Sequence, residues 1–208
     1  MSRITKDPQV RMTEILDAAE RLFYEQGYHE TAISDIVKAI DVAQGTFYYY
    51  FKSKEEILEA LINRQMSLVV FRMEKMVSNA SLAPARKLEQ FIQILFHTIR
   101  YKDGLLFEFL FDDQHLHLMD KMTRQGKQIT IPFLQRIIEE GVQKKVFNVA
   151  EPLVALTFVG GVMHNLFDVT YEKLPTRLYA QHVEMAAILI EKIVGLPGNS
   201  LEISMLPD

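Results

Sequence analysis

Hydroxylated aromatic side chains and lysines crowd the segment from Gly45 to Glu56, which reads GTFYYYFKSKEE. On a short helix, such a run packs one aromatic face inward and presents hydroxyls and ammonium groups on the other face. Tyrosine, threonine and lysine are donors that hold a protein on the phosphates of a DNA duplex. The residue types therefore indicate a nucleic-acid contact. The alternative is that the aromatic rings only fill a core.

Sequence patterns on the N-terminal side of this run predict three helices. Apolar residues at helical spacing predict a first helix, which Gly27 ends in a left-handed conformation. Thr31 is suited to cap a second, short helix that reaches Ile40, and a tight turn at 41–42 leads to a third helix over 44–50. Two short helices joined by a tight turn form a helix-turn-helix.

A longer helix follows at once. Ser53 and Glu56 have the spacing of a capping box, so this helix is expected to begin there and to continue towards Val77. Lys54 then lies in its first turn, where backbone amides and the helix dipole favour an anion. We therefore expect Lys54 to bind a phosphate.

Roles at the DNA follow from position. Gln44 opens the third helix, whose N-terminal residues reach base edges, and a glutamine pairs well with adenine; the alternative is a solvated side chain. Gly45 lets the backbone approach closely, whereas Tyr50 and Phe51 are expected to pack inward. The residues expected to bind DNA are Thr31, Gln44, Gly45, Thr46, Tyr48, Tyr49 and Lys54.

These positions together resemble the TetR/AcrR family of bacterial transcriptional regulators over about residues 10–60. The resemblance rests on Ile15 to Ala19, Leu22-Phe23, Gly27-Tyr28, Thr31, Asp35-Ile36, Val42, Gly45-Thr46, Tyr48, Tyr50-Phe51 and Ser53 to Glu55. It implies an all-helical fold, with a three-helix helix-turn-helix DNA-binding domain at 1–54 and a larger helical ligand-binding and dimerisation domain at 55–208. It also implies a homodimer that binds a palindromic double-stranded DNA operator, with repression as the expected effect and activation left open, and release by a small-molecule inducer.

The turn of the helix-turn-helix departs from the family's usual Ala-Gly-Val-Ser, because this chain has Ile-Asp-Val-Ala at 40–43. Aspartate tolerates a left-handed conformation better than most residues but less well than glycine. Ala43 replaces a serine that would cap the third helix, and losing such a cap costs about 1 kcal/mol. We therefore expect packing of Val42, Phe47 and Phe51 to hold this helix.

Positive charge is sparse for a DNA-binding protein. The formal net charge is −4, and residues 1–54 hold seven basic and eight acidic residues. Few phosphates are then neutralised, so we expect weak non-specific binding and a modest salt dependence. Arg3 and Lys6 form an arm towards the minor groove in one interpretation and a disordered terminus in the other.

Other classes of protein find little support in the 208 residues. Without cysteine there are no disulfides and no thiolate metal sites, which suits a reducing cytoplasm. The N-terminus is polar, unlike a signal peptide, and the longest apolar run, 153–163, is too short for a membrane span of about 20 residues. No phosphate-binding glycine loop, nucleophile elbow or zinc-protease motif suggests an enzyme, and no cofactor is expected.

Aromatic residues and methionines collect in the middle of the chain, where they suit a pocket for a hydrophobic inducer, either a drug-like compound or an acyl chain. They suit a plain core equally well. His97 and His164 are polar residues expected to orient the ligand. The residues expected to bind it are Phe96, His97, Tyr101, Phe107, Phe111, Met122, Phe133, Met163, His164 and Phe167.

Two final helices, expected over about 151–171 and 175–194, carry small residues that let helices approach closely. By the resemblance, these helices form a four-helix dimer interface. The alternative is that they only cover the core of one chain. The residues expected in the interface are Leu156, Gly160, Val183, Ala187, Ile190 and Val194.

Two further interpretations stay open. The segment from Asp112 to His117 holds carboxylates and imidazoles, which are ligand types for zinc or nickel, so a metal-responsive regulator is one alternative. Its spacing is poor, because His115 and His117 would point to different faces of a helix, and no metal site is expected. The second alternative is an interaction module that has kept the fold and lost DNA binding, since Ala43 and the near-neutral N-terminal segment both weaken the DNA interpretation.

Overall fold

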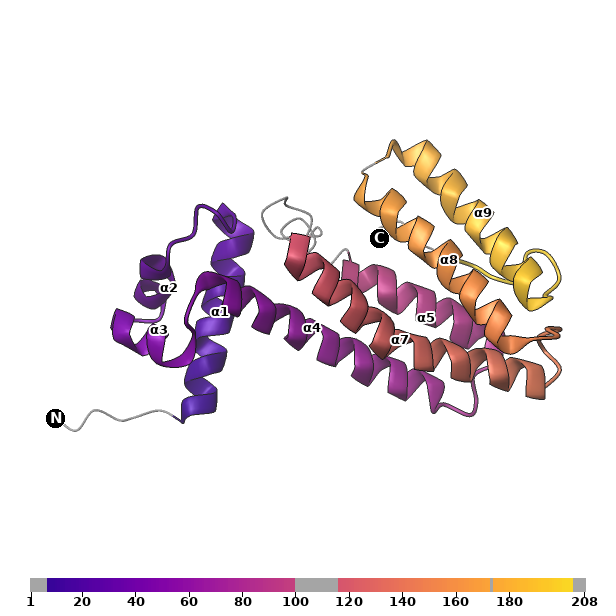
Figure 1. Cartoon of the computed structure of the whole chain (residues 1–208), viewed down its shortest axis with the longest axis horizontal. Coiled ribbons are helices and arrows are strands. Elements are labelled where there is room, and N and C mark those ends of the chain that lie inside the picture. Colours follow the sequence, from indigo (N-terminus) through magenta and orange to yellow (C-terminus); the bar gives the residue numbers. More distant parts are fainter. Residues whose placement is uncertain (1–6, 100–115, 173, 204–208) are drawn as a thin grey trace. The chain divides into compact units, whose positions relative to one another are not determined.

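The computed structural model describes residues 7–99, 116–172 and 174–203, and α-helices make up most of this part of the chain (Figure 1). No strand occurs among the described residues, so the predicted all-helical fold is confirmed. The helices are α1 (Pro8–Gln26), α2 (Ile33–Ala39), α3 (Gln44–Tyr50), α4 (Lys54–Val77), α5 (Pro84–Ile99), α7 (Leu116–Gln143), α8 (Pro152–Tyr171) and α9 (Thr176–Val194).

The chain divides into two compact units. The first comprises residues 1–67 and 100–119, and the second comprises residues 68–99 and 120–208. Within the first unit, α1, α2, α3 and the N-terminal part of α4 surround a core that includes Ile15, Phe23, Ile36 and Phe47, none of which is exposed. This unit contains the helix-turn-helix.

Capping and proline residues set several helix ends. Asp7 caps α1, because its Oδ1 accepts the amide of Gln9 at 2.8 Å. Helix α5 begins at Pro84, since a proline at the first helical position has no amide to leave unsatisfied. Gly195 ends α9 in a left-handed conformation, with φ 70° and ψ 31°.

Helix α7 is longer than its apolar pattern predicts. That pattern indicates a helix only from about Thr123, interrupted or kinked at Pro132, whereas α7 begins at Leu116 and runs past the proline. In its N-terminal half, Asp120 and Arg124 form an ion pair at 2.6 Å between successive turns. A helix predicted over 105–111 falls outside the described residues.

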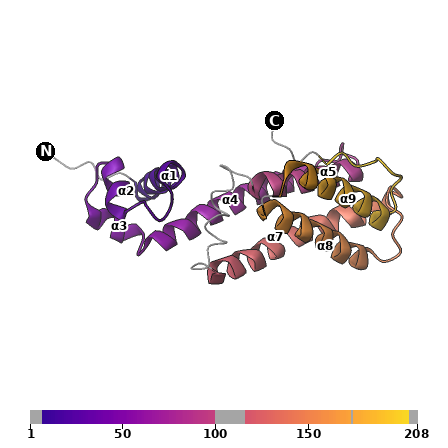
Figure 2. The ribbon, with the colours of Figure 1, turned by 90° about the horizontal axis from the view of Figure 1, so that it is seen from above.

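The second unit has its own apolar core, which the C-terminal part of α4 shares with α5, α7, α8 and α9. Phe96, Ile137, Leu166 and Ile190 are among the residues that meet there, each almost fully buried. Helices α8 and α9 lie side by side and run in opposite directions, as both views show (Figures 1 and 2). Each buries one face in this core.

A buried lysine connects three helices of the second unit. Lys87 of α5 is only 1% exposed, and its Nζ donates to the carbonyl of Val77 at the end of α4 and to Oε2 of Glu140 in α7, both at 2.7 Å. Burial raises the pKa of Glu140, but hydrogen bonds from Lys144 and Lys87 outweigh this effect, so its pKa is lowered. The ammonium thus satisfies a helix-end carbonyl that has no partner within its own helix.

Replacing Lys87 with methionine is expected to lower the free energy of unfolding by about 3 kcal/mol, because it leaves a buried carbonyl and one oxygen of the Glu140 carboxylate without their donor. Lys144→Met is the matched control. Lys144 contacts the same carboxylate at 2.6 Å but is half exposed, so its loss is expected to cost less than about 1 kcal/mol. Urea denaturation followed by circular dichroism measures both, and equal losses would contradict the assignment.

Candidate nucleic-acid interface

The turn between α2 and α3 has the left-handed residue that the sequence predicts. Asp41 has φ 52°, and the amide of Val42 donates to the carbonyl of Val37 at 3.0 Å, which closes the end of α2. An aspartate therefore occupies a position that glycine adopts more readily. The two helices of the helix-turn-helix are joined as expected.

The connection between α1 and α2 differs from its prediction in two ways. Gly27 has φ 92° but ψ 153°, which is outside the left-handed helical region, although its amide still closes α1 by donating to Phe23. Ala32, not Thr31, is the N-cap of α2, and the carboxylate of Asp35 accepts the Ala32 amide at 2.9 Å.

Thr31 is turned into the protein. Only 1% of its surface is exposed, and its hydroxyl donates to the carbonyl of Gly27 at 2.6 Å and accepts from Nε2 of Gln26 at 3.2 Å. A hydroxyl in this position has no free path to a phosphate. The structure therefore gives Thr31 a role in shaping the loop over residues 27–31, in place of the expected DNA contact.

Packing holds α3, because its N-terminus has no side-chain cap. Ala43 is the N-cap residue and makes no capping hydrogen bond, as its side chain predicts. Phe47 is fully buried and Phe51 is 3% exposed, with ring centroids 6.1 Å apart, while Val42 is half-buried. A seven-residue helix is not stable alone, so this burial fixes α3 in the first unit.

The opposite face of α3 carries the polar residues that the sequence assigns to DNA. Gln44 and Gly45 are exposed in the first turn, and Tyr48 and Tyr49 follow one turn later with 53% and 77% of their surface exposed. Spacing of four residues aligns these pairs along one side of the helix. Thr46 is half-buried. The structure thus brings Gln44, Gly45, Tyr48 and Tyr49 together on one surface, which we call the α3 face.

Lys54 does not join the α3 face. Its Nζ donates to the carbonyls of Tyr28 at 2.5 Å, Thr31 at 3.0 Å and His29 at 3.3 Å, and it lies 4.3 Å from the centre of the Tyr28 ring. Burial lowers the pKa of Lys54, and the nearby Glu30 carboxylate opposes that effect. The predicted phosphate ligand therefore contacts the protein's own backbone.

The start of α4 confirms half of its predicted capping box. The Glu56 amide donates to Oγ of Ser53 at 3.1 Å, but the Glu56 carboxylate accepts the amide of Lys52, one residue earlier than a capping box requires. Burial, and then the charge of Glu55, raise the pKa of Tyr28 to about 12. The first turn of α4 contains Glu55 and Glu56, so it carries negative charge and does not favour an anion.

Most arginines of the first unit are used within it. Arg11 pairs with Glu14 at 2.7 Å, Arg21 pairs with Glu25 at 3.3 Å, and Arg64 bridges two carboxylates of α1. Among the residues described in this unit, Lys38 and Lys52 have exposed side chains and no ion pair. From the sequence, Lys38 is assigned no role in DNA binding. Its position as a basic residue in the last turn of α2 is the signal that would identify it. Arg3 and Lys6 lie outside the described residues.

The predicted dimer residues divide between core and surface. Val183, Ile190 and Val194 are buried in the core of the second unit, so they have no surface left to bury against a second copy. Leu156 and Ala187 are half-buried, and Gly160 is exposed. The exposed apolar surface of α8 and α9 instead consists of Leu153, Val154, Phe158, Leu178, Met185, Ile188 and Leu189, which we call the α8–α9 face.

The predicted ligand residues are scattered. Phe96, Phe133 and Met163 lie in the core of the second unit, whereas His97 and His164 are exposed and cannot orient a buried ligand from there. Phe167 is half-buried and stacks on His164. Tyr101, Phe107, Phe111 and the side chain of Met122 lie outside the described part of the chain.

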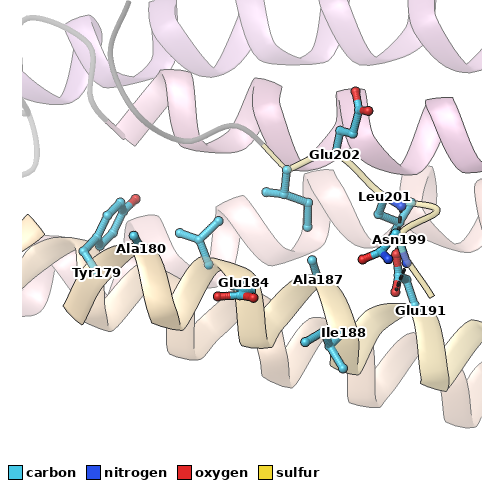
Figure 3. Close-up of a pocket in the computed structure, with 11 residues that line it drawn as sticks. Tyr179, Ala180, Glu184, Ala187, Ile188, Glu191, Asn199, Leu201 and Glu202 are labelled. Carbon is cyan, nitrogen blue, oxygen red and sulfur yellow. Dashed lines mark hydrogen bonds between the residues drawn. The ribbon is translucent and has the colours of Figure 1, made fainter. Parts of the chain in front are cut away.

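A cavity of about 460 Å³ lies elsewhere in the second unit, between α9 and the segment that follows it (Figure 3). Of the predicted ligand residues whose side chains are described, none lines it. The buried carboxylate of Glu191 holds the segment in place by accepting the amides of Asn199, Ser200 and Leu201 at 3.2, 2.7 and 2.8 Å. The lining residues include Tyr179, Val183, Glu184, Ala187, Ile188 and Ile203.

Two other predictions meet the structure only partly. Of the described helices, α8 over Pro152–Thr170 is long and apolar enough to cross a membrane, with a mean hydropathy of 1.4 and 28% of the window buried. The apolar run 153–163 therefore covers only part of this hydrophobic window, although the helix itself closely matches the predicted range of about 151–171. No cluster of three metal-ligating side chains occurs among the described residues, and Asp112 to His115 are not among them.

Sequence comparison identifies relatives of the first unit. The family profile described as bacterial regulatory proteins, tetR family, matches residues 15–61. The fatty acid metabolism regulator protein of Bacillus subtilis (strain 168) is 38% identical over 78 residues, which are 38% of this chain and 40% of that protein. The match thus spans less than half of the relative's length.

Solved structures extend the likeness along the chain. A TetR/AcrR-family transcriptional regulator from Thermobifida fusca YX-ER1 aligns over 89% of this chain and 97% of its own, with 25% identity and a TM-score of 0.64. FadR from Bacillus subtilis in complex with stearoyl-CoA aligns over 88% of this chain and 97% of its own, with 24% identity and a TM-score of 0.56. The matched family is one of regulators, not of enzymes.

Adding the missing cap to α3 is expected to stabilise the first unit. Ala43 is exposed and extended, with φ −72° and ψ 148°, a conformation in which a serine hydroxyl accepts an amide of the first helical turn. Ala43→Ser should therefore raise the free energy of unfolding by about 1 kcal/mol, measured by urea denaturation. Ala43→Val is the control, since it adds a side chain without an acceptor; an equal gain from both variants would exclude capping as the cause.

Proposed function

The chain is a member of the tetR family of bacterial regulatory proteins, and we propose that it is a transcriptional regulator that represses from a palindromic operator as a homodimer. A small hydrophobic inducer releases it. The observation that carries this proposal is the α3 face, on which Gln44, Gly45, Tyr48 and Tyr49 are exposed together while Phe47 is buried beneath them. Its place of action is the cytoplasm, where the operator DNA is.

The chemistry of the α3 face supports specific duplex binding. Gln44 is the direct reader, because it lies at the N-terminus of the recognition helix and an amide pairs bidentately with adenine. The hydroxyls of Tyr48 and Tyr49 bind phosphates, and Lys38 and Lys52 add two cations. At Gly45 an added Cβ would meet no protein atom within 4 Å, so packing within the chain does not require a glycine there. In the proposed complex, the glycine lets the backbone approach DNA closely.

The α8–α9 face supports dimerisation. It is a set of large, exposed apolar side chains on two adjacent helices, and exposed apolar surfaces mark protein contacts. Gly160 and Gly161 are exposed with open space around them, so their small size is of no use within the chain but admits a neighbouring helix. A two-fold dimer would place two α3 faces roughly 34–36 Å apart, one turn of a palindromic site.

Of the two inducer classes that the sequence suggests, the acyl chain has the stronger support. A long acyl chain, presented as a coenzyme A thioester, is supported by the fold shared with FadR in complex with stearoyl-CoA and by the fatty acid metabolism regulator of the same organism. Such a ligand must bind the DNA-free conformation more tightly than the DNA-bound one. Thermal-shift measurements with acyl-CoAs of increasing chain length test this, with free coenzyme A and small phenols as comparisons; stabilisation by phenols alone would overturn it.

Operator binding is expected to depend on the tyrosine hydroxyls of the α3 face. Tyr48→Phe and Tyr49→Phe should each weaken binding about tenfold, since a hydrogen bond to a charged group contributes about 1.5–3 kcal/mol. Fluorescence anisotropy on fragments of DNA that flank the gene measures the effect, with excess competitor DNA present. Tyr24→Phe is the control, because Tyr24 is also half exposed but lies on α1. A folded dimer that binds no fragment would support the interaction-module alternative.

Replacing Phe158 with glutamate is expected to convert the dimer to monomers at micromolar concentration, because a charge would be buried in an apolar interface. Phe71→Glu is the matched control. The two phenylalanines are 62% and 67% exposed, but Phe71 lies on α4, outside the α8–α9 face. Sedimentation equilibrium distinguishes the variants, and a Phe158→Glu protein that stays dimeric would show that the interface lies elsewhere.

A further inference from the structure

We propose that Lys54 is a positioning residue for operator binding, which acts on the DNA through the protein backbone and not as a phosphate ligand. This inference rests on the proposed DNA-binding function of the first unit. Lys54 is the first residue of α4, directly after the turn that ends α3, and its ammonium contacts the loop over residues 27–31, which leads into α2.

The hydrogen bonds of Lys54 leave it no donor for DNA. An ammonium has three N–H groups, and Nζ of Lys54 has three carbonyl acceptors, those of Tyr28, His29 and Thr31 at 2.5, 3.3 and 3.0 Å. Contact with the Tyr28 ring at 4.3 Å adds a cation–π attraction. A phosphate would have to replace one of these partners, and a loop carbonyl would then lose its charged donor.

The position of Lys54 in its helix also argues against a phosphate ligand. A cation at a helix N-terminus is opposed by the helix dipole, so it needs compensating acceptors, which the three carbonyls provide. Glu55 and Glu56 follow immediately and place negative charge at the start of α4. These carboxylates would repel a phosphate that approached Lys54, whereas Lys52 precedes them in the chain and is exposed.

The contact joins the two outer ends of the helix-turn-helix. The loop over residues 27–31 lies just before α2, and Lys54 lies just after α3. The inner ends of the same helices are already joined by the turn at Asp41, where the amide of Val42 closes α2. With both ends connected, the tilt of α3 is determined, and the α3 face is held in the geometry that the grooves of DNA require.

The loop itself is prepared for this contact. The Thr31 hydroxyl donates to the carbonyl of Gly27, and the Thr31 amide donates to the carbonyl of Tyr28 at 3.2 Å. The Tyr28 ring is buried edge-on against Phe23 of α1, with centroids 5.0 Å apart. A loop held in this way presents its carbonyls at fixed positions, so a lysine of the correct length transmits position and not only charge.

The decisive variant is Lys54→Arg, because it keeps the charge but places a planar, wider guanidinium where three carbonyls converge on one nitrogen. Lys54→Met removes the charge, and Lys52→Arg and Lys52→Met are the matched controls two residues away. Operator affinity is measured by anisotropy at several salt concentrations, at a temperature where circular dichroism shows each variant fully folded. Both Lys54 variants should bind about tenfold more weakly, with an unchanged salt slope. Lys52→Met should reduce the slope by about 1.8, because the homodimer loses one phosphate contact in each of its two subunits.

Two outcomes of this experiment would overturn the proposal. Wild-type affinity of Lys54→Arg, together with a slope reduced by about 1.8 in Lys54→Met, would identify a phosphate ligand in each subunit. Wild-type affinity of both Lys54 variants in the folded state, with only a lower melting temperature, would identify a residue that serves stability alone.

Hydrogen exchange separates failure of the proposed function from failure of this inference. If the wild-type protein binds no fragment, the proposed function fails, and exchange still tests whether Lys54 positions α2 and α3. Amide exchange followed by mass spectrometry reports the order of α2 and α3 without DNA. Lys54→Arg is expected to accelerate exchange in peptides covering residues 28–50, whereas Lys52→Arg leaves them unchanged. Acceleration confined to the first turn of α4 would overturn the positioning role.

Discussion

Burial of Phe47 is the interaction on which the DNA-facing side of this protein depends. Helices α2 and α3 have seven residues each, too short to be stable in isolation, and α3 has no side-chain cap. Fully burying a phenylalanine side chain contributes about 1.5–3 kcal/mol, and Phe51 adds a second ring next to it. Because these rings face inward, Tyr48 and Tyr49 between them face outward, whereas Tyr50 is half-buried. The same packing that stabilises α3 therefore creates the α3 face.

Charged side chains also satisfy backbone groups at several helix ends. Lys54 and Lys87 both direct an ammonium at backbone carbonyls, those of the loop over residues 27–31 and that of Val77. Glu191 does the converse, with a carboxylate that accepts three consecutive amides after α9. Backbone groups at helix ends lack partners within the helix, and a charged side chain satisfies several of them at once. These charged groups are used for hydrogen bonds within the chain. In the first unit they include Lys54, a cation that is expected from the sequence to bind DNA.

Helices α8 and α9 show why apolar spacing alone does not separate core residues from surface residues. Both helices carry apolar residues on more than one face, so one set must meet the core and another must remain outside. Val183 and Ile190 are in the core, whereas Met185 and Leu189 are exposed, although all four have a similar apolar character. Periodicity identifies the faces of such a helix but does not say which face meets the chain's own core.

Local chemistry is what the sequence determined by itself. Capping residues, prolines and glycines depend on neighbours within a few positions, so the bounds of α3, the end of α4, the start of α5 and the uncapped Ala43 could all be predicted. The α3 face followed from the same local spacing. The tertiary structure alone decided where side chains meet across the sequence. Lys54 contacts carbonyls 23 to 26 residues away, and Thr31 turns inward because the loop closes around it. Such partners are set by three-dimensional packing, which no short-range pattern records.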